Sequence, residues 1–336
     1  MTRSRVLVAL GGLAISAIFL WLAIRDADPE AVRDALGGAN VGLVLLASFA
    51  FMVGYLLQAI RWRKIAATPQ VGVRRFYEMV LGGLACNNVL PIRIGEVVRA
   101  GWLSREAPMP GGRALGSVAL DRVCDIVALV IFLVIGLQAV PTPAWLRNMI
   151  VGAAVLLIVI VAALVFARVY TRSRGRDRRD RGRIRRIVRD TIDFLGEPIG
   201  RHRAALWLGL SLLAWSLGAV AVYLVARSVG VELAPLEAVF VASALALGVA
   251  IPSSPGYIGT YQLIAVEALG LLDVDQSQAL AFSILMHASW FVPTTLIGGA
   301  IIGWRALRLG ERPAAPAMQD HSIAGLERPG GVSDST

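Results

Sequence analysis

A short polar stretch interrupts one of the apolar regions of this sequence, and its residue types suit the binding of an anion. The segment NNVLPIRIGEVVRA, residues 87–100, holds two amides, a proline, two arginines and a glutamate. Arginine carries a rigid fork of donors that matches phosphate oxygens, and an asparagine amide can donate to the same oxygens or close a turn. Two arginines with one carboxylate leave a net positive charge. The stretch therefore predicts a phosphate-binding site that includes Asn87, Asn88, Arg93, Glu96 and Arg99.

A purely structural reading of the same charges stays open. Glu96 lies three residues from both Arg93 and Arg99, a spacing at which helical side chains meet. An ion pair formed in this way would only stabilise the segment, as many buried ion pairs do. Part of the charge can also extend along its apolar stem to the membrane surface.

A second charged cluster lies in the apolar segment ALDRVCDIVAL. Asp121 and Asp125 are four residues apart on one helix face, and Arg122 lies three before Asp125, so the cluster is expected to partner the arginines of the first segment. A metal-dependent transferase would need carboxylates on a loop or at another spacing. The two cysteines and three histidines are too scattered to form a ligand cluster. We therefore expect no metal and no cofactor.

A third polar stretch, PSSPGYIGTYQ, resembles a helix start that favours an anion. Exposed backbone N–H groups at such a start attract negative charge, and the residues expected there are Pro252, Ser253, Ser254, Gly256 and Gly259, followed by Tyr261 and Gln262. The glycines can equally mean close helix packing. His287, in the middle of the last apolar run, is either a packing residue or a titratable group that faces a cavity.

The elements that must position these residues are membrane-spanning helices. Hydrophobic residues make up 57% of the 336 residues and charged residues only 17%. A bilayer core of about 30 Å needs roughly 20 apolar residues to cross it. Runs of this kind predict a polytopic all-α membrane protein with six full spans, at residues 6–24, 41–60, 118–140, 150–167, 204–226 and 279–303.

The charge distribution sets the expected topology. Eleven arginines stand against two aspartates between Arg168 and Arg189, a balance of +9, and positive loops stay in the cytoplasm. Tyr170 is the only aromatic residue there, which argues against a nucleic-acid partner. Residues 184–195 have the pattern of a basic helix on an anionic leaflet. Both termini are then expected in the cytoplasm and residues 26–34 outside, with a cytoplasmic position also for Arg61, Arg63, Lys64, Arg74 and Arg75.

Two apolar regions are broken by proline and must each return to the side from which they came. The predicted hairpins are residues 76–103, broken at Pro91, and residues 236–272, broken at Pro252. Neither pair of arms is long enough to span, and the hairpins are expected to enter from opposite sides so that their tips meet near the midplane. Span, broken hairpin and span occur twice in opposite orientation, which is typical of inverted-repeat transporters. Alternatively, the hairpins are short helices without function, surrounded by protein.

The expected organisation of the chain follows from this repeat. We expect an N-terminal helix and outer loop at 1–40, a first repeat at 41–140, a linking helix with a basic cytoplasmic loop at 141–203, a second repeat at 204–303 and a disordered cytoplasmic tail at 304–336.

The motifs, taken in order, are similar to those of a known family. LPIRIGEVVRA, DRVCDIVAL and PSSPGYIGTYQ resemble the signatures of the lysylphosphatidylglycerol synthase transmembrane, or flippase-like (UPF0104-type), family over residues 5–308. By position, the resemblance implies roles for Pro91, Arg93, Gly95, Glu96, Arg99, Arg122, Asp125, Pro252, Gly256 and Gly259. The sequence departs from the family pattern at Gln262, where an acidic residue is common, and at His287, where an arginine is expected.

The resemblance implies an inner-membrane protein of the bacterial type that moves a lipid between leaflets, with no soluble synthase domain and so no synthase activity. The expected ligand is an anionic phospholipid or a polyprenyl-phosphate lipid. Two alternatives remain. One is a membrane-embedded transferase acting on a lipid-linked sugar, with Glu96, Asp121 or Asp125 as base. The other is a noncatalytic subunit that presents lipid to a partner enzyme.

Overall fold

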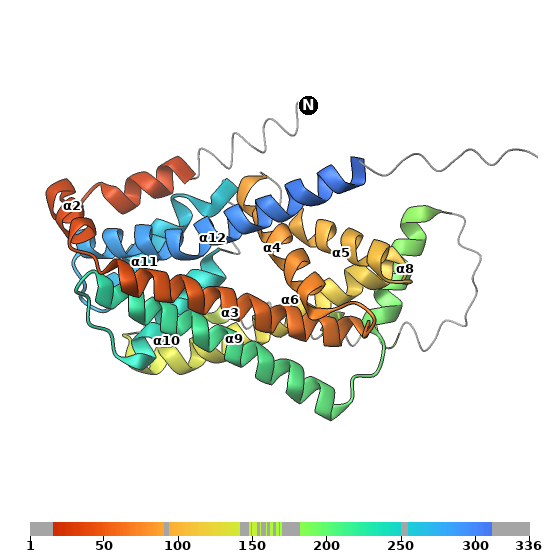
Figure 1. The fold of residues 1–336 in the computed structure, drawn as a ribbon. Helices are drawn as coiled ribbons and strands as arrows, with labels where there is room; N and C mark the ends of the chain where they lie inside the picture. Colours follow the sequence, from red (N-terminus) through yellow and green to blue (C-terminus); the bar gives the residue numbers. More distant parts are fainter. Residues whose placement is uncertain are drawn as a thin grey trace, which may run out of the picture.

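The computed structural model is an elongated bundle of helices (Figure 1). It describes residues 16–90, 94–141, 182–249 and 255–310, together with scattered positions between 148 and 169. Regular structure in these described residues is helical throughout, which agrees with the predicted all-α class. Pro91, Arg93, Pro252, Ser253 and Ser254, the basic loop before residue 182 and the tail after residue 310 lie outside the described residues.

Four long helices form the frame of the bundle. They are α3 (Val41–Ala66), α6 (Gly111–Gly136), α9 (Arg201–Ser228) and α12 (Gln276–Gly310). At 1.5 Å per residue, the shortest of them measures about 39 Å, more than the roughly 30 Å of a bilayer core. By length and composition, α3, α9 and α12 up to Leu307 can cross a membrane. Helices long and apolar enough to span a membrane are therefore present where spans were predicted at 41–60, 204–226 and 279–303.

The remaining predicted spans are seen only in part. The span predicted at 118–140 overlaps α6, which has the length of α3 but carries three charged residues within its apolar part. Residues 16–24 are helical, and the rest of the span predicted at 6–24 lies outside the described residues. Most of the span predicted at 150–167 also lies outside them.

Four shorter helices form two hairpins at the regions broken by proline. The first hairpin consists of α4 (Val73–Val89) and α5 (Gly95–Glu106), and the second of α10 (Pro235–Gly248) and α11 (Thr260–Gly270). Their lengths are about 16 to 26 Å, so each arm is shorter than a bilayer core. The described residues also include two single 3-10 turns, η1 (Leu137–Ala139) after α6 and η2 (Pro255–Tyr257) before α11.

The two ends of the bundle differ in charge. The acidic helix α2 (Pro29–Gly37) and the basic helix α8 (Arg183–Leu195) lie at opposite ends (Figure 1). The backbone N–H of Asp28 donates to Ser277 Oγ at 3.0 Å and ties α2 to the start of α12. Thr191 Oγ1 donates to the carbonyl of Gly112 at 2.9 Å and ties α8 to the start of α6. We call these the acidic end and the basic end.

The hairpins enter the bundle from these opposite ends. α4 follows the basic end of α3, and Arg305, near the end of α12, contacts Glu106 at the end of α5 at 2.6 Å. α10 follows α9, whose last residue, Ser228, accepts the N–H of Asn40 next to α2 at 3.0 Å. The tips meet, because a Cβ built at Gly256 of the second hairpin would lie 3.5 Å from the carbonyl oxygen of Asn88.

The two halves pack against each other in corresponding ways. α3 packs along α9, α12 packs along α4, and α6 packs along α10. At the second crossing a Cβ on Gly298 would lie 2.8 Å from the Cβ of Ala85, and at the third a Cβ on Gly136 would lie 2.6 Å from the Cα of Phe240. Only glycine permits such close approach of two helices.

The apolar core has two main parts. The larger one is formed mainly by α9, α10, α11 and α12 and includes the buried Phe240, Phe282 and Met286. The second, around α3, α4 and α5, includes Trp62 and Phe76, whose rings pack edge to face with centroids 4.7 Å apart. The charged cluster lies next to this second part.

Candidate functional site

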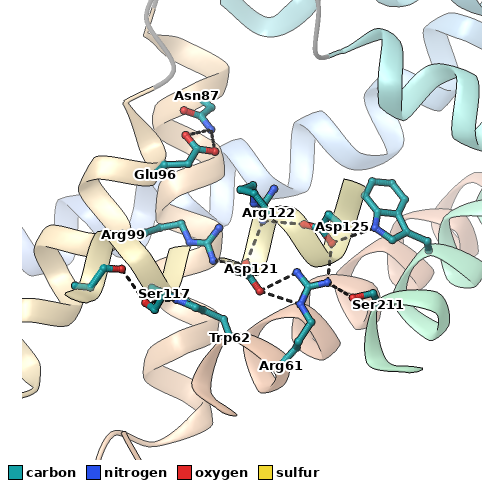
Figure 2. Close-up of polar contacts among 12 residues, drawn as sticks. Arg61, Trp62, Asn87, Glu96, Arg99, Ser117, Asp121, Arg122, Asp125 and Ser211 are labelled. Carbon is teal, nitrogen blue, oxygen red and sulfur yellow. Dashed lines mark hydrogen bonds and ion pairs between the residues drawn. The ribbon is translucent and has the colours of Figure 1, made fainter. Parts of the chain in front are cut away.

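Asp121 on α6 is the centre of a buried ion-pair network (Figure 2). Its Oδ1 accepts from Arg61 Nε at 2.9 Å and lies 2.8 Å from Arg61 Nη2. Its Oδ2 accepts from Arg99 Nη2 at 3.0 Å and lies 3.4 Å from Arg122 Nη2. Both oxygens of this carboxylate are therefore held by arginines from α3, α5 and α6.

Asp125, one turn further along α6, is held by two of these arginines, Arg61 and Arg122, and by α9. Its Oδ1 accepts from Arg61 Nη1 at 2.7 Å and from Trp215 Nε1 at 3.1 Å, and its Oδ2 lies 3.2 Å from Arg122 Nη2. Arg61 Nη1 also donates to Ser211 Oγ at 2.6 Å. Arg61 thus joins three of the four long helices.

Burial and charge distinguish the members of this network. The side chains of Arg61 and Asp121 are 0% exposed and those of Arg99 and Asp125 are 5% exposed. Arg122 is 36% exposed. Three arginines face two aspartates, which leaves a positive charge, and Arg122 is the member that carries it toward the surface. A buried charge without a partner is strongly unfavourable, so the aspartates stabilise Arg61 and Arg99 as much as the reverse.

The amide of Asn87 orders the tip of the first hairpin. Its Oδ1 accepts the backbone N–H of Gly95 at 2.8 Å, and its Nδ2 lies 3.3 Å from both carboxylate oxygens of Glu96. A Cβ at Gly95 would overlap the carbonyl of Gly83 on α4. The predicted role of an asparagine in closing the turn agrees with this geometry.

The contacts of Arg99 contradict one of the two ion pairs expected for Glu96. An ion pair between Glu96 and Arg99 along the helix was expected as an alternative to ligand binding, but Arg99 reaches across to Asp121 on α6. Its guanidinium also stacks on the ring of Trp62, 4.3 Å from the centroid. Desolvation explains the choice, since a fully buried carboxylate gains more from a second arginine than the half-buried Glu96 does. The pairing of Glu96 with Arg93 lies outside the described residues.

Asn88 points away from this network. Its Nδ2 donates to the hydroxyl oxygens of Thr294 at 3.1 Å and Thr295 at 2.8 Å, next to Pro293 in α12. The side chain is buried, and its contacts join the hairpin tip to the last long helix. Its position therefore supports a role in holding the two halves together.

The polar residues of the second hairpin form a separate, neutral cluster. Gln262 Oε1 accepts the N–H of Gly259 at 2.7 Å, and Gln262 Nε2 donates to His287 Nδ1 at 3.1 Å. The amide of Gln262 thus caps the start of α11, where an anion was expected. The ring of His287 stacks between Tyr261 and Trp290, with centroids 4.8 and 5.1 Å away.

Close packing accounts for the glycines of this region. Gly256 and Gly259 have φ of +74° and +87°, in the region that favours glycine. A Cβ on Gly259 would also overlap the carbonyl of Ser16 in the first helical segment. His287 is 7% exposed and lines, with Gln262, a groove of about 400 Å³ between that segment, α11 and α12. His287 therefore packs against neighbouring rings and also lines a groove, so each of the two interpretations is correct in part.

The structure therefore brings the sequence-selected residues together in two groups. Arg99, Asp121, Arg122 and Asp125 lie in one network, with Asn87 and Glu96 beside it (Figure 2). Tyr261, Gln262 and His287 lie in the other. Tyr55 on α3, which sequence reasoning did not select, lies within electrostatic reach of Arg122 in the first group and of Tyr261 in the second.

Arg61 is the main residue that sequence reasoning missed. The positive-inside rule assigned it to the cytoplasmic side with Arg63 and Lys64 and gave it no partner, whereas its side chain is fully buried among α3, α6 and α9. A count of charge near a helix end does not say which way a side chain points, so the burial of Arg61 was not predicted. One signal was present: two aspartates and one arginine on an apolar helix require another cation.

Long apolar helices that bury an arginine–aspartate network, together with two hairpins of shorter helices, define a polytopic helical membrane protein. The chain belongs to the lysylphosphatidylglycerol synthase transmembrane-region family, whose model matches residues 9–298. This confirms the family resemblance found from the motifs.

The curated relatives have low sequence identity to this chain, but they align with most of its length. The chain is 28% identical over 344 residues to a protein named glycosyltransferase AglD from Haloferax volcanii, with 89% of this chain and 54% of the relative covered. It is 25% identical over 338 residues to a UPF0104 membrane protein from Methanothermobacter thermautotrophicus, with 92% and 98% covered. A UPF0104 membrane protein from Methanocaldococcus jannaschii is 24% identical over 217 residues, with 63% and 90% covered. The chain thus spans about half the length of the first relative and nearly all of the second.

Proposed function

We propose that this protein binds an anionic phospholipid or a polyprenyl-phosphate lipid and moves it between the leaflets of a plasma membrane. The observation that carries the proposal is Arg122, whose side chain is 36% exposed at the edge of a buried network in which three arginines contact two aspartates. Ionisable groups at membrane depth are costly and mark functional sites by default. A lipid phosphate has the charge and the acceptor geometry that this arginine requires.

The arrangement of the helices supports an inverted repeat around this site. The hairpins enter from opposite ends, and the α4–α12 and α6–α10 crossings use glycine in the same way. In transporters of this architecture, broken helices meet at the substrate site and one half moves against the other. We infer that both hairpins are re-entrant and that the basic end, with α8, faces the cytoplasm.

In this proposal the residues of the network have different roles. Asp121 and Asp125 hold Arg61 and Arg99 in place, which keeps α3, α5, α6 and α9 together. The N–H groups of the Arg122 guanidinium that do not contact the aspartates are left to bind phosphate oxygens. Glu96, held by Asn87 and within electrostatic reach of Arg122, competes with the phosphate and so favours release. The lipid tail stays in the bilayer.

A liposome assay tests this proposal directly. The purified full chain is reconstituted with phosphatidylglycerol that carries a fluorescent headgroup, and an impermeant reductant quenches the outer leaflet. We expect quenching beyond the outer-leaflet fraction in vesicles with protein, and its loss with Arg122→Gln. Arg113→Gln, which removes the same charge from an exposed position on the same helix, is the matched control and should transport normally.

Two outcomes contradict the proposal. If neither phosphatidylglycerol nor a labelled polyprenyl phosphate crosses in the presence of the wild-type protein, unassisted transport is wrong. If Arg122→Gln transports as the wild type does, the phosphate does not bind at this network. Unfolding temperatures of all variants, measured in the same detergent, separate a loss of transport from a loss of the fold.

A transferase function is the second candidate, and the name of the relative from Haloferax volcanii favours it. In that case Glu96 is the carboxylate best suited to act as base, since Asp121 and Asp125 are occupied by arginines. The same vesicles, supplied with Mg²⁺, an activated sugar and a polyprenyl phosphate, distinguish the candidates. Formation of a glycosylated lipid that Glu96→Gln abolishes would support the transferase and displace the translocase.

A further inference from the structure

A groove at the basic end of the bundle lies outside the network and is unused by the proposed function. It has a volume of about 490 Å³ and runs between the start of α4 and the last part of α12. The α4 side contributes Arg74 and Glu78, and the α12 side contributes Leu296, Ile297, Ala300, Ile301 and Trp304. Its size falls in the range of small-molecule sites, about 300–1,000 Å³.

The polar mouth of this groove carries an excess of positive charge. Glu78 is held by Arg74 Nε at 3.1 Å, by Arg75 Nη1 at 2.8 Å and by Arg305 Nη2 at 3.0 Å. Arg305 also contacts Glu106 at 2.6 Å, so three arginines face two carboxylates. The carboxylate in the groove is thus already neutralised.

Arg74 is the arginine of this group that lies in the groove and remains open to a ligand. Its side chain is 85% exposed, against 46% for Arg75 and 16% for Arg305. Within the described residues its contact with Glu78 uses only Nε, which leaves the two Nη groups for bidentate binding. Phosphate is the anion for which this fork is suited.

The opposite wall is apolar and belongs to a membrane-spanning helix. Leu296 is 67% exposed and Ile297 is 44% exposed, on a helix long and apolar enough to cross a bilayer. Trp304 is 43% exposed near the arginines, at a depth where tryptophan is typical of the membrane interface. Side chains of this kind face lipid tails, and arginines beside them face headgroups.

From this complementarity we propose a second lipid site, in which the groove binds an anionic phospholipid of the leaflet at the basic end. The phosphate contacts Arg74, and one acyl chain lies along Leu296, Ala300 and Ile301. Basic pockets between membrane helices bind anionic headgroups in the same way. The site is made of residues other than those of the network, so the test of this site does not depend on the proposed translocation.

Photocrosslinking in lipid nanodiscs tests this site. The full chain is placed in phosphatidylcholine nanodiscs that contain a small fraction of phosphatidylglycerol with a diazirine in one acyl chain, and labelled peptides are identified after irradiation. We expect labelling of the α12 segment that contains residues 296–304, and a roughly fivefold decrease with Arg74→Gln, as expected for one interfacial arginine. Arg75→Gln removes the same charge and a Glu78 contact from outside the groove, and should retain most of the labelling.

A second pair of variants tests the acyl-chain wall without changing charge. Ala300→Trp fills the groove and should abolish the labelling of this segment, whereas Ala306→Trp, at an exposed position of the same helix outside the groove, should not. The proposal is wrong if a phosphatidylcholine probe labels the segment equally, if Arg74→Gln and Arg75→Gln have equal effects, or if the wild type is not labelled there. The first of these outcomes would indicate ordinary annular lipid.

Discussion

The α4–α5 hairpin with α6 and the α10–α11 hairpin with α12 place polar groups at corresponding depths, but their chemistry differs. Asp121 and His287 each lie about three turns into the long helix that follows a hairpin arm. Around Asp121 there are three arginines and a second aspartate, whereas His287 has an amide and aromatic rings. A common scaffold therefore holds a charged site in one half and a neutral, packed site in the other.

The difference indicates where an anion can be bound. Backbone N–H groups at the start of α11 were expected to attract one, but the amide of Gln262 occupies the N–H of Gly259. In the charged half the Arg122 side chain stays 36% exposed, whereas the polar groups of the neutral half are closely packed. Substitutions that act on one half and spare the other test this division.

The largest effect is expected from Asp121→Ala, which removes the aspartate that Arg99 contacts and leaves Arg61 paired with Asp125 alone. Loss of one partner from a buried ion network costs about 3–5 kcal/mol, so the unfolding temperature in detergent should decrease strongly and the yield of folded protein should drop. Asp193→Ala, an exposed carboxylate on α8, is the control and should leave the unfolding temperature unchanged. An equally small change for Asp121→Ala would contradict the role given to the network.

Next in size is a matched pair of glycine substitutions, one at each crossing between the halves. Gly298→Ala would force α12 away from α4 at Leu81, and Gly136→Ala would force α6 away from α10 at Phe240. Overpacking of this kind costs about 1–3 kcal/mol. Thermal unfolding should show similar losses for both.

Gly299→Ala is the control for this pair, because a Cβ at Gly299 would meet nothing within 4 Å. If one crossing tolerates alanine and the other does not, the correspondence between the halves is weaker than the helix packing indicates.

A smaller effect is expected in the neutral half. Gln262→Leu removes the cap of Gly259 and the donor to His287 Nδ1, at a cost of about 1–2 kcal/mol for the groups left without partners. Gln278→Leu, at an exposed position of α12, should be neutral. A decrease in unfolding temperature as large as that of Asp121→Ala would remove the distinction between the two halves.

Much of the fold was predictable from the sequence, because apolar runs and prolines act locally. The runs at 41–60, 204–226 and 279–303 gave three helices, and the prolines at 91 and 252 marked the two breaks. Helix ends were less predictable. α4 begins at Val73, three residues before the expected start of the hairpin at residue 76, since its first turn carries the polar Arg74 and Arg75, which an apolar run does not include.

The site was predictable in its residue types but not in its pairing. Asp121, Asp125 and Arg99 stood out as charges in apolar segments, and they do lie together. Their connection through Arg61 depends on the packing of α3 against α6 and α9, which no local pattern encodes. Positions 61 and 63 look alike in sequence, and tertiary packing alone buries the first and leaves the second near the surface.

The smallest effect is expected from an ion pair that resembles those of the network in length but not in burial. Arg113 Nη1 lies 2.6 Å from Glu197, as close as any contact of Arg61, but its partners are 39% and 48% exposed. Such a pair contributes about 0–1 kcal/mol, so Glu197→Gln should shift the unfolding temperature little, and less still at high salt. Unfolding measured at low and high salt for Glu197→Gln and Asp121→Ala checks this. A salt-dependent loss at Asp121 as well would mean that water reaches the network, because only screening by mobile ions can weaken an ion pair in this way.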